Sequence, residues 1–145
     1  MDVKELAVGT ERVWALIFEA GDEAMSGLTT FARDAGLAGA RFQAVGAFAS
    51  VTVGWFDVAR QDYERVSFDE QLEVLSLLGD VALEDGRPRV HAHVVLGDRD
   101  ARAHGGHLLE GVVLPTLEVI LTESPAHLQK RFRAEFGLAL IDSTI

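Results

Sequence analysis

The chain of 145 residues contains no cysteine. This absence excludes disulfide bonds, thiolate metal ligands and a cysteine nucleophile. Long apolar runs are also missing, because no stretch approaches the roughly 20 residues that a transmembrane helix requires. Acidic residues interrupt the first 20 positions, and the apolar run 13–20 is too short for a secretory signal. We therefore expect a soluble, cytoplasmic protein that does not enter a membrane.

Basic residues are scarce relative to acidic ones. The 13 Lys and Arg stand against 23 Asp and Glu, which gives a formal net charge of −10. Proteins that bind nucleic acid through its phosphates depend on clustered Lys and Arg. The charge balance disfavours that class, and we assign no DNA-binding residues. Glycine-rich phosphate loops and the serine-hydrolase GxSxG pattern are absent as well.

The N-terminal half begins with a strand pattern and a helix pattern. Residues 11–21 (ERVWALIFEAG) are rich in large apolar side chains and predict a buried strand. Residues 22–37 have helical apolar spacing, with Asp22 as the expected N-cap and Gly36 as the expected terminator. From about 40 to 120, short β-rich runs separated by Gly, Asp and Pro predict a mainly antiparallel sheet.

The C-terminal segment carries start signals for a second helix. Ser124 can act as a cap and Pro125 as a first helical residue, with Lys130 and Arg131 toward the far end. Residues 137–141 (GLALI) predict a last strand. The expected fold class is α/β (α+β): a mainly antiparallel β-sheet flanked by one main helix and a short C-terminal helix. We expect residues 1–145 to form a single domain, since linkers and repeats are absent.

Four of the five histidines lie between residues 89 and 111. His91 and His93 are two apart in a strand-like run, so their side chains share one face, roughly 6.5–7 Å apart along the strand. Neutral imidazole is a favoured zinc ligand, and this pair predicts two corners of a metal site. A lone pair of this kind is also typical of two half-exposed polar residues.

A third ligand depends on how the chain folds back after residues 97–100 (GDRD), which predict a turn. An even loop places His104 opposite His93. An odd loop, or a bulge at Gly105–Gly106, brings His107 opposite His91. The spacing leaves both arrangements open.

Three nitrogen ligands without a thiolate are typical of open zinc sites, where water or a small molecule takes the fourth position. Glu110 is the nearest downstream carboxylate. Its carboxylate could accept a hydrogen bond from a metal-binding histidine or act as a general base. The alternative is that Glu110 is a solvated surface charge.

One short segment is similar to a DNA-binding motif. Residues 86–89 (GRPR) match the core of an AT-hook, whose arginines enter the minor groove. Glu84 and Asp85 stand where the hook needs basic residues, and Asp85–Gly86 makes a good turn between two strands. We therefore interpret the segment as a hairpin turn.

The histidine-containing block 91–111 (HAHVVLGDRDARAHGGHLLEG) is similar to a segment of a known protein family. LPTLEVIL follows it, and QAVGAFASVTVGWFD and LEVLSLLGDV precede it. In this order the segments resemble the PPC (plants and prokaryotes conserved) domain, from about Arg12 to Ile141. The resemblance implies an antiparallel sheet flanked by a helix, a homotrimer, and a metal site made by the HxH pair and the histidine of GGH.

Carried onto this chain, those ligands are His91, His93 and His107. The resemblance leaves His104 outside the ligand set, as a candidate for an outer position together with Glu110. The leading hypothesis is a trimeric, zinc-binding protein with a small-molecule ligand at the metal. The alternative is a DNA-binding or regulatory protein with structural histidines. Catalytic residues and the presence of an enzymatic activity are not assigned.

Overall fold

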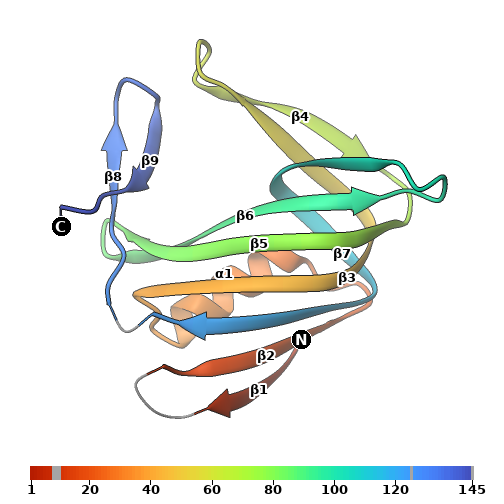
Figure 1. Ribbon diagram of the computed structural model, residues 1–145, viewed down its shortest axis with the longest axis horizontal. Helices are drawn as coiled ribbons and strands as arrows, with labels where there is room; N and C mark the ends of the chain where they lie inside the picture. The colour runs from red at the N-terminus through yellow and green to blue at the C-terminus, as the bar shows by residue number, and fades with distance from the viewer. Residues whose placement is uncertain (8–10, 125, 145) are drawn as a thin grey trace.

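Antiparallel strands make up most of the structure, a computed structural model that describes residues 1–145 except 8–10, 125 and 145. Seven strands form one sheet in the order β1-β2-β7-β6-β5-β3-β4, and two more form a separate hairpin (Figure 1). This confirms the mainly antiparallel α+β fold. The elements are β1 (Asp2–Ala7), β2 (Val13–Glu19), α1 (Ala24–Asp34), β3 (Gly39–Asp57), β4 (Asp62–Phe68), β5 (Leu72–Glu84), β6 (Arg87–Gly97), β7 (Ala103–Glu123), β8 (Lys130–Arg133) and β9 (Leu138–Ile141).

The helix α1 follows β2 as predicted, but its cap is different. Glu23 is the N-cap, and its carboxylate accepts hydrogen bonds from the backbone N–H groups of Met25 at 3.1 Å and Ser26 at 2.7 Å. Asp22, the expected cap, instead accepts a hydrogen bond from the Glu19 N–H. Gly36 follows the helix with φ of +65°, the left-handed conformation that ends helices.

Two long strands, β3 and β7, pair with each other as well as with their other neighbours, and this extra pairing partly closes the sheet. β3 pairs with β5 and β7, β5 pairs with β6, and β6 pairs with the first residues of β7. The interior is apolar and continuous with the buried side of α1. Its largest fully buried side chains are Phe18, Phe48, Leu16, Leu28, Leu37, Leu72, Leu77, Leu96, Leu108, Leu117, Leu121 and Val81.

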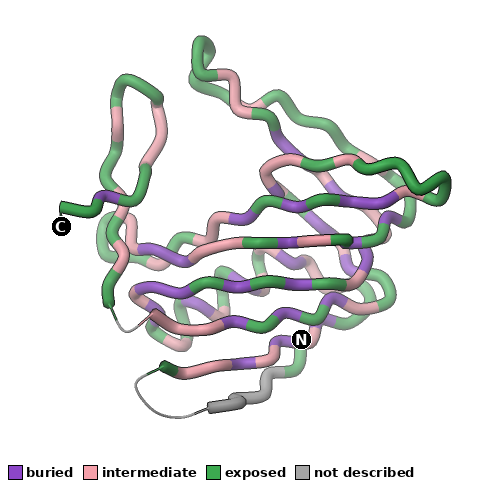
Figure 2. The backbone as a smooth tube through the Cα atoms, in the orientation of Figure 1, coloured by how far each residue is buried: buried purple, intermediate pink, exposed green. Residues whose placement is uncertain are grey.

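Side chains alternate between this core and the opposite side of the sheet (Figure 2). In β6, Ala92, Val94 and Leu96 are buried, whereas His93 and Val95 are exposed. We call the side of the sheet turned away from α1 the open face. Its exposed apolar side chains, between 40% and 59% accessible, are Val45, Leu75, Leu78, Val95 and Ile120.

The predicted C-terminal helix is wrong. Residues 130–141 form the β8–β9 hairpin, and the predicted last strand is its second strand, β9. Asp142 explains the preference for a hairpin. It is buried, and its N–H donates a hydrogen bond to the Gln129 carbonyl. Its carboxylate forms ion pairs with Arg131 and Arg133. The capping role proposed for Pro125 lies outside the described residues.

The turn between β5 and β6 confirms the hairpin interpretation of the GRPR segment. Asp85 and Gly86 both have positive φ, +50° and +73°, as a two-residue hairpin turn requires. Arg89, in the strand that follows, forms an ion pair with Glu84 at 3.1 Å. Among the described residues, no helix is long and apolar enough to cross a bilayer.

Candidate metal centre

The register of β6 and β7 brings three histidines together. His93 is the cross-strand partner of His107, and His91 lies two residues before His93 on the same face. This differs from both predicted registers, which placed His107 opposite His91 or His104 opposite His93. His104 is instead the partner of Leu96.

Asp98 accounts for this register. Its Oδ1 accepts hydrogen bonds from the N–H groups of Asp100 and Arg102, both at 2.9 Å, and its own N–H donates to the Arg102 carbonyl. These bonds close an odd loop between Gly97 and Ala103, so no bulge is needed in the β6–β7 pairing.

The glycine pair at 105–106 has a different purpose from the predicted bulge. A Cβ atom at Gly105 would lie 2.6 Å from the Val94 carbonyl oxygen, and one at Gly106 would lie 2.8 Å from that of Gly54. Both distances are too short for a side chain. Glycine therefore lets β7 approach its neighbours closely immediately before His107.

The imidazoles form a tight cluster. One nitrogen from each of His91, His93 and His107 lies within 4.8 Å of the other two. The Nε2 atoms of His91 and His93 are 3.3 Å apart. The ring centroids are separated by 5.0–5.4 Å.

A carboxylate and a lysine lie next to the His91 ring of the cluster. Asp80 Oδ2 is 3.1 Å from His91 Nδ1, which leaves Nε2 of that ring directed toward His93. Lys130 Nζ is 4.0 Å from Asp80 Oδ1. The Lys130 side chain is only 10% exposed, and it begins strand β8 instead of lying toward the end of the predicted helix.

Burial and the neighbouring imidazoles lower the pKa of His93 and of His107. Burial lowers the pKa of His107 to about 4, with further contributions from the nearby His91, His93 and Lys130. Burial, and then the neighbouring His91, also lower the pKa of His93. Nδ1 of His107 is buried and has no hydrogen-bond partner among the described residues. Neutral imidazole with a free lone pair is the form that binds a metal.

The lowered pKa of His107 predicts a pH-dependent stability for the metal-free protein. In the unfolded chain this imidazole takes up a proton near pH 6.5, whereas in the folded chain it does so near pH 4. The unfolded state therefore binds more protons between these values. We expect the free energy of unfolding to fall by at most about 2 kcal/mol from this group between pH 7 and pH 5.

Urea unfolding of metal-free protein at several pH values in that window measures this effect. The comparison is His107→Asn, in which the decrease between pH 7 and pH 5 should be smaller than in the wild type. An equal decrease in both proteins would show that His107 is not responsible.

The two other predicted site residues lie outside the cluster. Glu110 is 67% exposed, and its ion-pair partner is Arg65 at 3.7 Å. His104 Nε2 contacts Asp98 Oδ2 at 3.1 Å, and its ring packs against Phe68. The structure thus brings together only the three histidines of the HxH and GGH segments.

Sequence reasoning missed Asp80, although a signal for it exists. Asp85–Gly86 is a two-residue turn with Glu84 opposite Arg87, and counting outward from it pairs Asp80 with His91. Lys130 carried no such signal, because the β8–β9 hairpin itself was not predicted.

A cleft of about 580 Å³ lies beside the cluster. Polar residues line one part of it, and the β8–β9 hairpin lines the other. The tip of the β3–β4 hairpin contacts the tip of the β8–β9 hairpin (Figure 1). The contact is a hydrogen bond of 3.0 Å from Gln61 Nε2 to the Ala134 carbonyl. Its lining includes His91, His107, Tyr63, Lys130, Phe132 and Ile141.

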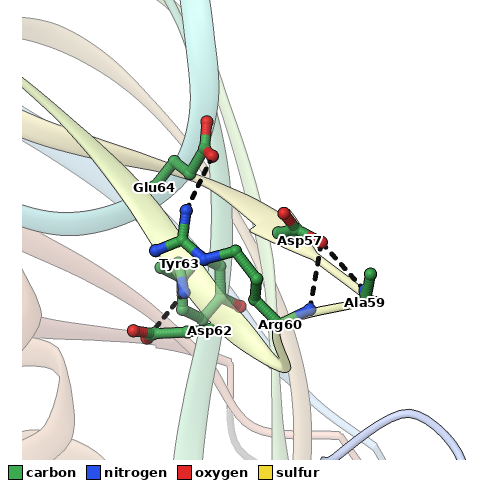
Figure 3. A network of polar contacts seen from close by, with 6 residues as sticks. All are labelled: Asp57, Ala59, Arg60, Asp62, Tyr63 and Glu64. Atoms are coloured by element: carbon green, nitrogen blue, oxygen red, sulfur yellow. Dashed lines mark hydrogen bonds and ion pairs between the residues drawn. The ribbon is translucent and has the colours of Figure 1, made fainter.

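The β3–β4 turn holds Tyr63 at this cleft. Asp57 Oδ1 accepts hydrogen bonds from the N–H groups of Ala59 and Arg60, and Arg60 pairs with Glu64 at 3.1 Å (Figure 3). The Tyr63 ring packs against His107 with centroids 4.8 Å apart. Burial raises the pKa of Tyr63, so its phenol is protonated at neutral pH.

Comparison with known proteins identifies the family. A family model described as the Plants and Prokaryotes Conserved (PCC) domain matches residues 6–125. The chain belongs to this family. The matched residues include α1, strands β2 to β7 and all three clustered histidines, whereas the β8–β9 hairpin lies beyond them.

Solved structures agree with this assignment over nearly the whole chain. A PPC protein of Pyrococcus horikoshii is 27% identical, with a TM-score of 0.84 and coverage of 98% of this chain and 95% of that one. A protein of Archaeoglobus fulgidus, described as metal-containing, is 31% identical, with a TM-score of 0.84 and coverage of 99% and 100%.

Two other relatives are informative about the fold and the family alone. A protein of Bacteroides thetaiotaomicron, described as a candidate DNA-binding protein, has a TM-score of 0.88 at 20% identity, with coverage of 99% of both chains. The bifunctional protein GlmU of Synechococcus sp. (strain JA-3-3Ab) is 35% identical over 121 residues. These are 82% of this PCC-domain chain but 18% of that protein, so the chain spans about a fifth of its length.

Proposed function

We propose that residues 1–145 act as a single metal-binding PCC domain in which His91, His93 and His107 hold one zinc ion. The observation that carries this proposal is the 3.3 Å between Nε2 of His91 and Nε2 of His93, with a His107 nitrogen within 4.8 Å. Zinc–nitrogen bonds of about 2.0–2.1 Å at tetrahedral angles separate two ligand atoms by about 3.3–3.4 Å. The Archaeoglobus fulgidus relative described as metal-containing supports the same conclusion.

Asp80 fits the role of the outer residue that orients a ligand. Metal-binding histidines commonly donate their second ring N–H to a carboxylate, and His91 Nδ1 has this partner at 3.1 Å. We give this role to Asp80 in preference to Glu110 and His104, whose contacts are elsewhere.

Three protein ligands leave a fourth position for water or a small molecule. A zinc ion bound there supplies Lewis acidity and lowers the pKa of a bound water toward ~7. The adjacent cleft offers room for a ligand, because about 580 Å³ is within the range of small-molecule sites. The chain's own residues would bind and orient that ligand.

The open face is the proposed contact between subunits of a homotrimer. Isolated exposed apolar residues are common, but Val45, Leu75, Leu78 and Ile120 line one shallow depression. A row of cross-strand partners connects this face to the site: Ile120 faces Gln43, which faces Leu78, which faces His93. A neighbouring subunit on this face would border the metal centre.

Nucleic acid binding is the less favoured function. The net charge is −10, and Arg89 of the GRPR segment is already paired with Glu84. We also propose a cytoplasmic location.

Elemental analysis of untagged protein tests the metal proposal. After addition of zinc and extensive dialysis, we expect about one zinc per chain. Protein that remains folded and holds no zinc would contradict the proposal. The same measurement on protein as first purified identifies the metal that is acquired in the cell.

Asp80→Asn should weaken zinc binding without abolishing it. The amide keeps the size of the side chain but removes the negative charge beside His91, and such outer partners affect metal affinity by about 10- to 100-fold. A competition titration with a chromophoric chelator measures this change. The matched control is Glu110→Gln, which neutralises an exposed carboxylate that pairs with Arg65 outside the cluster, and it should leave zinc affinity unchanged.

A further inference from the structure

The cleft beside the histidine cluster has two chemically different walls. One wall carries His91, His107, Tyr63 and Lys130, the first residue of β8, and the other consists of the rest of the β8–β9 hairpin. On the face of the hairpin that also carries Lys130, two large apolar side chains are exposed: Phe132 at 64% and Ile141 at 45%. Exposed apolar side chains facing a cleft favour a ligand with an apolar part.

Lys130 supplies a positive charge to the polar wall. Its side chain is nine-tenths buried, yet its only ion-pair partner among the described residues is Asp80 Oδ1 at 4.0 Å, beyond hydrogen-bonding distance. Asp80 Oδ1 is itself buried with no hydrogen-bond partner in the described part of the chain. A buried ammonium group with unused donors favours an anionic acceptor.

The charges around the cleft favour an anion only when the metal is bound. Asp80 and Glu84 balance Lys130 and Arg89, and Arg89 is held by Glu84 at 3.1 Å. Three neutral imidazoles would leave the full charge of a divalent ion uncompensated. An anion at the fourth position would compensate this charge and lie on the Lys130 side of the cleft.

We propose that this cleft binds a small carboxylate that carries an apolar group, with the carboxylate between the metal and Lys130 and the apolar group against Phe132 and Ile141. The inference rests on the proposed metal site. The β8–β9 hairpin, which lies outside the residues matched by the family model, would then determine which carboxylates this chain accepts.

Calorimetric titration of the zinc-loaded protein tests this proposal, with zinc stoichiometry measured separately in every variant. The probes are hexanoate, its uncharged analogue hexanamide, and acetate. We expect hexanoate to bind at least about tenfold more tightly than either of the others. Equal affinity for hexanoate and hexanamide, or for hexanoate and acetate, would overturn the proposal.

Variants separate the two walls. Lys130→Met should weaken hexanoate binding about tenfold with zinc still bound, whereas Lys130→Arg should retain most of the affinity. Phe132→Ala should weaken hexanoate but not acetate. Arg33→Met, an exposed position on α1, is the matched control. Unchanged hexanoate affinity in folded Lys130→Met would also overturn the proposal.

Failure of the metal site and failure of the ligand site give different results. If the wild type binds no zinc, the proposed function and the carboxylate site both fail. If zinc binds at one per chain and hexanoate shows no preference, only the carboxylate site fails.

Discussion

His107→Ala is expected to lower the affinity for zinc by about a thousandfold. Zinc sites contribute about 10–16 kcal/mol of binding free energy, so an equal share for each of three ligands is about 4 kcal/mol. His107 is the proposed ligand on β7, and without it only the His91–His93 pair on β6 would remain. Chelator competition measures the affinity, and zinc-dependent thermal unfolding gives an independent value.

His104→Ala is the matched control for this experiment. It removes an imidazole from the same strand, but its ring contacts Asp98 and Phe68 and lies outside the cluster. The control should keep the zinc affinity of the wild type. If both variants bind zinc as the wild type does, the three-histidine site is wrong. If His104→Ala alone loses zinc, the ligand set must be revised.

Leu78→Asp is expected to dissociate the proposed trimer. Leu78 is 59% exposed in the single chain, lies on the open face, and is the cross-strand partner of His93. A carboxylate in the centre of an apolar interface would be desolvated without a partner in each of three subunits. The mass in solution should fall from about three chains to one chain of 15.7 kDa.

Sedimentation velocity at micromolar concentration measures this change. Thr30→Asp, an exposed position on α1 on the opposite side of the sheet, introduces the same charge and should leave the trimer intact. Circular dichroism checks that both variants fold. A monomeric wild type, or a Leu78→Asp protein with unchanged mass, would contradict the proposed interface.

Much of the fold could be predicted because its signals are local. The helical spacing of residues 22–37 and the glycine at 36 identify α1, and the Asp85–Gly86 pair identifies a hairpin turn. Short β-rich runs without a second long helix indicate antiparallel pairing. The HxH pair was found in the same way, since two residues on one strand share a face whatever the register.

Other features depend on contacts that no local pattern encodes. Spacing alone does not identify the third histidine, because the length of the β6–β7 loop is set by hydrogen bonds that the Asp98 carboxylate accepts. The prediction of a C-terminal helix is wrong because Asp142 forms ion pairs with Arg131 and Arg133 in the β8–β9 hairpin. The local sequence carries only helix signals there: a capping serine, a proline and basic residues. Lys130 therefore lies in β8 beside the candidate site, and not toward the end of a C-terminal helix.

The most direct test is anomalous X-ray diffraction from crystals of zinc-loaded protein, with data collected above and below the zinc absorption edge. The account predicts one difference peak per chain, bonded to nitrogen atoms of His91, His93 and His107 at about 2.0–2.1 Å. A well-ordered histidine cluster without a peak, or zinc bound only at other residues, would contradict the account.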